Sequence, residues 1–150
     1  MGMYPKSVQE ITNANATASV KAAINALVAA IDEPNPTLII NDGQLVKDSA
    51  TTPLTVTIQV VNYAGVPIRH QFPVKVWISV TATGYPGGTQ TVGAPSAGAV
   101  FETVSVNQSF EYITNKDGEL VFTVTAASAG LRYVRATCNG PVFTGTLQWT

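Results

Sequence analysis

His70 is the residue best suited to act as an acid or base near neutral pH, because it is the only histidine in the 150-residue chain. A catalytic histidine needs a nucleophile or a carboxylate beside it. Its neighbour is Arg69, whose charge disfavours a protonated ring, and no serine, cysteine or carboxylate is placed nearby to complete a triad. We therefore interpret His70 as an ordinary loop histidine.

The only cysteine and four acidic residues are the other candidates for chemistry. Cys138 shares an apolar face with Val134 and Ala136, where a thiol is usually an inert small hydrophobe. The acidic residues lack the Asp-x-Asp spacing of a calcium loop and are interpreted as turn formers and solubilising charges. They are Asp42, Asp48, Asp117 and Glu119. The sequence thus predicts no catalytic, cofactor-binding or metal-binding residue, and a protein that is not an enzyme.

Charged residues are scarce throughout the chain. They make up 11% of the sequence and leave a net charge of −1, so no basic patch is available to hold phosphates and no nucleic acid partner is expected. No apolar run reaches membrane-spanning length, and the N-terminus lacks the basic segment and apolar core of a secretory signal. We expect synthesis in the cytoplasm and no membrane insertion.

The elements that would position these residues divide near Pro34. Before it, Ser19 to Asp32 contains no glycine or proline and predicts a short helix, with one apolar stripe made by Val20, Ile24, Leu27 and Ile31. That stripe is a candidate assembly interface, and the alternatives of docking on its own domain and of self-association stay open. The prolines at 34 and 36 end the helix, so residues 1–36 are predicted as a helical segment with a linker.

Residues 37–150 have the period of β-strands. Apolar residues alternate with polar ones over 54–60 and again over 74–80, which places Trp77 on the face opposite the core valines and makes it a possible anchor for a partner. Further strands are predicted over 100–106, 110–113 and 120–124, with an Asp-Gly hairpin turn at 115–118. Phe143, Gly145, Leu147 and Trp149 share a face of the last strand.

About seven short strands separated by turns predict a mainly β fold, an antiparallel sandwich with a short N-terminal helix. The Gly/Pro-rich stretch from 84 to 98 is too long for a simple hairpin turn. Its tip is a candidate exposed binding loop, with a flexible spacer as the alternative interpretation. The tip residues are Tyr85, Pro86, Gly87 and Gly88.

Four segments in order resemble the bacterial immunoglobulin-like repeat of the invasin and intimin adhesins. They cover about two-thirds of the chain and are Leu54–Ile68, Val74–Trp77, Thr114–Thr125 and Ala129–Gly140. The family usually has an aromatic two residues after Ala-Gly, where this chain has Arg132 followed by Tyr133, so a one-residue slip or bulge is expected there. The resemblance implies an immunoglobulin-like sandwich. Similar single domains occur in virion proteins of tailed phages.

Two functions are consistent with this sequence. In the first, the protein is a virion structural component, a capsid decoration or tail-associated protein at the virion surface. Its N-terminal stripe would dock on the phage capsid or tail lattice, as a homo-oligomer, while the sandwich projects. In the second, it is an adhesive module that recognises a protein or glycan on the host cell surface through its loops. Neither function requires a cofactor.

Overall fold

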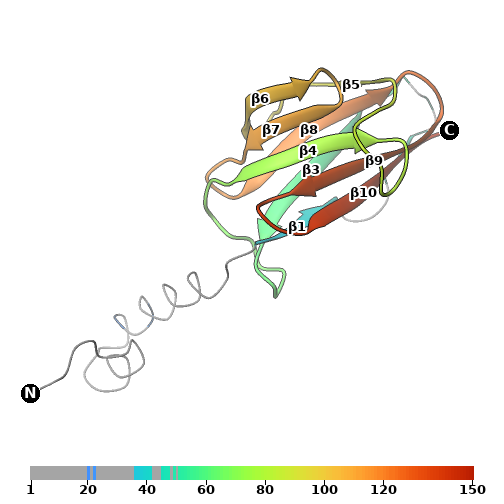
Figure 1. Cartoon of the computed structure of the whole chain (residues 1–150). Helices are drawn as coiled ribbons and strands as arrows, with labels where there is room; N and C mark the ends of the chain where they lie inside the picture. Colours follow the sequence, from blue (N-terminus) through green and yellow to red (C-terminus); the bar gives the residue numbers. More distant parts are fainter. Residues whose placement is uncertain (1–19, 21, 23–35, 42–44, 48, 50) are drawn as a thin grey trace, which may run out of the picture. The chain divides into compact units, whose positions relative to one another are not determined.

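The computed structural model describes residues 20, 22, 36–41, 45–47, 49 and 51–150. Val20 and Ala22 are helical and exposed. The rest of the predicted helix, including Ile24, Leu27 and Ile31, lies outside the described residues. The described part of the compact unit Asn35–Thr150 contains ten strands (Figure 1). They are β1 (Thr37–Ile40), β2 (Leu45–Lys47), β3 (Leu54–Val61), β4 (Pro73–Ser79), β5 (Gln90–Val92), β6 (Ala99–Ser105), β7 (Ser109–Ile113), β8 (Glu119–Ala126), β9 (Gly130–Thr137) and β10 (Val142–Trp149).

The strands form two sheets. One has four strands in the order β1-β3-β8-β5, and the other has six in the order β2-β10-β9-β4-β7-β6. All pairs are antiparallel except β2 with β10, which is parallel. The orders A-B-E-D and G-F-C define an immunoglobulin sandwich. The order β1-β3-β8-β5 corresponds to A-B-E-D, and the order β10-β9-β4 corresponds to G-F-C. The predicted mainly β, immunoglobulin-like fold is therefore confirmed.

The core lies between the two sheets because apolar residues alternate along the long strands. β8 alternates buried and half-buried residues along its whole length, and β3 and β4 behave similarly. The ring of Tyr112 stacks between the rings of Phe110 and Phe122, with ring centres 5.4 Å and 5.5 Å away, respectively. The three rings fill space between the sheets. Of the face predicted for the last strand, Gly145, Leu147 and Trp149 are buried and Phe143 packs at its margin.

Three details differ from the sequence-based predictions. The turn Asn115–Gly118 does not close a hairpin, because it joins β7 of the six-stranded sheet to β8 of the four-stranded sheet. The stretch 84–98 is not a single loop, since β5 forms within it and pairs with β8. Val80 does not belong to the core face, because β4 ends at Ser79 and the Val80 residue is 51% exposed.

The expected slip near Arg132 is also wrong. β9 pairs with β10 from Thr137 to Gly130 in unbroken register. Arg132 faces the core side and is buried, while Tyr133 faces outward and is half-buried. The register shifts occur instead in β6, between Val100 and Glu102 and between Thr103 and Ser105.

Candidate functional site

The predicted binding loop folds back onto the outer face of the six-stranded sheet. It connects β4 to β5, and its path is fixed by the carbonyl oxygen of Gly84. That oxygen accepts hydrogen bonds from Trp77 Nε1 and from Arg135 Nη1, each at 3.2 Å. The Gly87 N–H donates to the Ile78 carbonyl oxygen at 3.0 Å. We call the segment 80–89 the β4–β5 loop.

The Trp77 indole supports this loop from below. Trp77 and Arg135 lie directly opposite each other on β4 and β9, and the Arg135 guanidinium carbon is 5.3 Å from the centre of the Trp77 ring. The ring is half-buried, and its only N–H is bonded to Gly84. The role of Trp77 as an anchor for a partner stays a prediction, and its contacts give it a second role in holding the loop.

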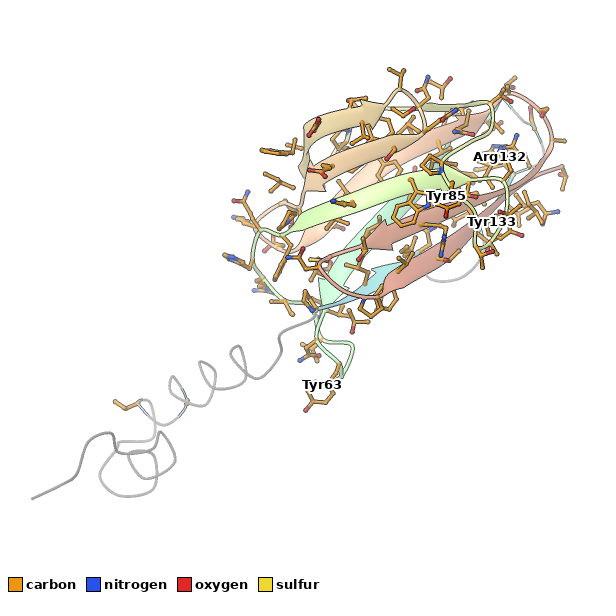
Figure 2. All side chains as sticks on the ribbon, in the orientation of Figure 1. Tyr63, Tyr85, Arg132 and Tyr133 are labelled. Atoms are coloured by element: carbon orange, nitrogen blue, oxygen red, sulfur yellow. The ribbon has the colours of Figure 1, made fainter. Side chains whose placement is uncertain are left out.

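Tyr85 lies on the β4–β5 loop, which passes over the face of the six-stranded sheet in the view of Figure 2. Its residue is 91% exposed, and Pro86 beside it is exposed as well. Another turn lies between β3 and β4 and carries Tyr63, whose residue is 88% exposed. Among the described residues, Tyr85 and Tyr63 are exposed to nearly the same degree, and Tyr85 directly follows Gly84, whose carbonyl oxygen both Trp77 and Arg135 contact.

The base of the loop contains two buried polar side chains. Gln90 donates to the Asn107 carbonyl oxygen at 2.7 Å and to Gly87 at 3.3 Å, whereas its Oε1 has no partner. Arg132 Nε is also without a partner. Both atoms lie near Gly88, where an added Cβ would be 2.7 Å from Gln90 Oε1 and 3.3 Å from Arg132 Nε.

Two surface depressions lie elsewhere on the sandwich. One, of about 300 Å³, is lined in part by Lys75 and Glu111, which form an ion pair at 3.4 Å. The other, of about 380 Å³, is lined by Ile39 of β1, the adjoining Asn41, Leu45 of β2 and side chains of β3. Lys75 and Glu111 pair with each other, and none of the described residues that line the second depression is charged.

The residues considered for chemistry are placed apart. His70 is exposed and packs edge-on against Phe72, with ring centres 5.3 Å apart. Cys138 is buried, and burial raises the pKa of its thiol, which keeps it protonated and inert. Among the described residues, no three histidine, cysteine or acidic side chains are grouped to hold a metal ion. Asp42 and Asp48 lie outside the described residues.

None of the described helical residues belongs to a helix long and apolar enough to cross a membrane. No protein-family model matches the chain, and no curated protein matches it.

Solved structures similar to this chain include enzymes and surface proteins. A glycosyl hydrolase family 2 member from Bacteroides cellulosilyticus is 19% identical over 77% of this chain, with a TM-score of 0.49. Domains 4 and 5 of the S-layer protein SbsC are 15% identical over 77%, with a TM-score of 0.42. The D0-D1 domain of intimin is 14% identical over 78%, with a TM-score of 0.40.

The chain spans only part of each of these proteins. It covers 14% of the glycosyl hydrolase, 54% of the SbsC chain and 49% of the intimin chain. A second structure of the hydrolase is also covered to 14%. Identities below 20% with TM-scores below 0.5 carry no information about activity or partners.

The prediction that the protein is not an enzyme needs correction. The sequence-based conclusion that the protein is not an enzyme rested on the missing triad and the missing metal spacing. A region resembling this sandwich forms a small part of a glycosyl hydrolase chain. A domain can lack catalytic residues of its own and still belong to an enzyme, so the missing triad and metal spacing do not support the conclusion that the protein is not an enzyme, and that conclusion is withdrawn.

Proposed function

We propose that this chain is a binding module that displays its immunoglobulin-like sandwich at a surface and contacts a protein or glycan through the β4–β5 loop. One observation carries the proposal. Tyr85 is 91% exposed on a loop whose backbone is held by Trp77, Arg135 and Ile78. A tyrosine exposed to this degree contributes little to the core and leaves its ring available for contact with a partner, here on a loop that is held in place.

A held loop favours binding over a spacer role. A loop that already has its bound shape loses little conformational entropy when the partner arrives, so more of the contact energy is expressed as affinity. Tyrosine adds a large, rigid apolar ring and one hydroxyl, which suits both sugar rings and protein pockets. The scarcity of charge favours contact by packing rather than by electrostatic steering.

The test compares two equally exposed tyrosines. The labelled full chain is applied to a glycan array and to a panel of intact bacterial cells, with Tyr85→Ala and Tyr63→Ala beside it. We expect Tyr85→Ala to bind at least about tenfold more weakly, as at an aromatic hot spot, while Tyr63→Ala stays within about twofold of the natural chain. Equal binding by all three proteins, or no binding at all, overturns the proposal.

The role of Trp77 in holding the β4–β5 loop is tested separately. Trp77→Phe keeps an aromatic ring on β4 and removes the N–H that bonds Gly84. We expect weaker binding with little loss of thermal stability, because the loop is less well held while the sandwich core is unchanged. Unchanged affinity would show that the loop does not need Trp77 to keep its shape.

For the biological setting, we propose a tailed-phage virion, with residues 1–36 docked on a capsid or tail lattice. The proposal is supported by the family resemblance and by the apolar stripe of Val20, Ile24, Leu27 and Ile31. Co-sedimentation with stripped capsids and tails tests it. Ile24→Ser with Leu27→Ser should abolish co-sedimentation, and Tyr85→Ala, which leaves the stripe intact, should not. Failure of the natural chain to sediment with either particle contradicts this setting.

A further inference from the structure

The turn between β9 and β10 carries a pair of residues that can react with each other. β9 ends at Thr137 and β10 begins at Val142, and these two residues form the last pair of the ladder. Asn139 and Gly140 lie in the connection, and both are exposed. Asn139 is the only asparagine in the sequence that is directly followed by glycine. The pair stands outside the ladder, so its backbone can rotate without separating the two strands.

The reaction joins the side-chain amide of an asparagine to the backbone nitrogen of the next residue. The Gly140 nitrogen attacks Cγ of Asn139 and closes a five-membered succinimide ring, which the closeness of the two groups along the chain favours. A bond forms between that nitrogen and Cγ, and the bond from Cγ to the amide nitrogen breaks. Ammonia leaves with the proton that Gly140 gives up. Glycine suits this attack because it has no Cβ to obstruct it.

We propose that Asn139 is a site of spontaneous deamidation whose rate is limited by the hydroxyl of Thr137. The Gly140 N–H lies 3.4 Å from Thr137 Oγ1, and Thr137 Oγ1 donates to the Gly140 carbonyl oxygen at 2.8 Å. The first contact is too long to hold the nitrogen firmly, since N–H···O bonds usually span about 2.7–3.2 Å. The second ties Gly140 to β9 and opposes the rotation about Asn139 that brings the nitrogen to Cγ.

The turn can accommodate the products. Water opens the ring at either of two bonds. Breaking the bond from the Gly140 nitrogen to Cγ gives aspartate, and breaking the bond to the Asn139 carbonyl carbon gives isoaspartate, whose backbone is longer by one carbon. Asn139 has φ +54°, a left-handed conformation that aspartate also tolerates. The extra carbon of isoaspartate falls in the connection, so the ladder of β9 and β10 is kept.

Deamidation changes the charge of the depression beside the turn. Asn139 and Gly140 line the depression of about 300 Å³ together with Lys75 and Glu111, which pair with each other. Either product adds a carboxylate there and lowers the net charge of −1 by one. Among the described residues that line the depression, two carboxylates then share one lysine. The modification thus marks an aged chain with a local negative charge.

The experiment follows the full chain during incubation in mildly alkaline buffer, with peptide mapping by mass spectrometry. Deamidation adds one mass unit at Asn139, and three in water enriched in the heavy oxygen isotope. Asn62, Asn107 and Asn115 are internal controls, because larger residues follow them. We expect Asn139 to react at least about tenfold faster than these, a difference of about 1.4 kcal/mol in barrier. An unmodified Asn139, under conditions that convert the same residue in the chain unfolded by urea, overturns the proposed site.

Variants of Thr137 test the control of the rate. Thr137→Val keeps the shape of the side chain and removes the hydroxyl, so deamidation should be about two- to tenfold faster, as expected from losing one net hydrogen bond. Thr137→Ser keeps the hydroxyl and should retain the natural rate. Thr144→Val is the matched control, since Thr144 is exposed on β10 and should leave the rate unchanged.

Circular dichroism shows whether each variant is folded before the rates are compared. A folded Thr137→Val that reacts at the natural rate or more slowly overturns the role of Thr137, and so does a Thr137→Ser that reacts as fast as Thr137→Val. This inference does not depend on binding by the β4–β5 loop, which follows the other end of β4 from the one that pairs with Thr137.

Discussion

Tyr112 shows how a single residue is tied to the pH dependence of the whole fold. It is 1% exposed between the rings of Phe110 and Phe122. Burial raises the pKa of its hydroxyl far above the ordinary value near 10, because the phenolate cannot be hydrated between the sheets. The neutral hydroxyl is therefore the form that the folded state accepts.

The sign of the consequence follows from proton release. Above about pH 10 the unfolded chain loses the Tyr112 proton while the folded chain keeps it, so the free energy of unfolding falls as pH rises. Below that pH the stabilisation is fully present. Between about pH 9 and 11.5, the free energy of unfolding measured by urea titration should fall less in Tyr112→Phe than in the natural chain. Tyr85→Phe is the control, because it removes a hydroxyl that lies outside the core. Equal slopes in the natural chain and Tyr112→Phe would contradict this role of burial.

At the scale of elements, the turn Asn115–Gly118 carries the chain from one sheet to the other. The Gly118 N–H donates to the Asn115 carbonyl oxygen at 3.1 Å, and Asn115 Oδ1 accepts from Asp117 N at 2.9 Å. Gly118 has φ +74° and is buried, with the backbone of Ile68 directly against it. The position needs a residue that both tolerates positive φ and has no Cβ.

Two glycine substitutions separate these requirements. Gly65→Ala introduces strain alone, since Gly65 has φ +79° and no atom lies within 4 Å of an added Cβ. That should cost about 1–2 kcal/mol. Gly118→Ala has the same strain and a clash with the Ile68 carbonyl oxygen. We expect it to be less stable than Gly65→Ala by at least about 1 kcal/mol in urea unfolding. Equal losses would show that the turn yields without cost.

At the scale of the whole molecule, the described core lies entirely between Leu38 and Trp149. A chain that begins at Asn35 therefore keeps every described core residue. We expect it to retain a β-type circular dichroism spectrum and a cooperative thermal transition within a few degrees of the full chain. Loss of cooperative unfolding would show that the first 34 residues complete the fold. Light-scattering masses of both chains report whether those residues add to self-association.

The sequence by itself predicted the long strands, because their signal is local. Val56 and Ile58 on β3 and Phe122 on β8 alternate with polar residues and are buried as expected. Trp77 was placed correctly on the outer face by the same alternation. The β4–β5 loop was identified by its composition, although that composition could not show that the loop is held.

Tertiary structure decided everything that depends on partners far along the chain. β5 has three residues and exists because Gln90 to Val92 pair with 124–126, and the sheet change at Asn115–Gly118 depends on where β7 and β8 each find a neighbour. Arg132 stands where the resembling family usually has an aromatic, which suggested a slip, yet an unbroken pairing with β10 keeps it in register. Alternation assigns a residue to a face of its strand, whereas hydrogen bonding between distant segments decides which strands meet, so the anchored loop emerged only in the folded chain.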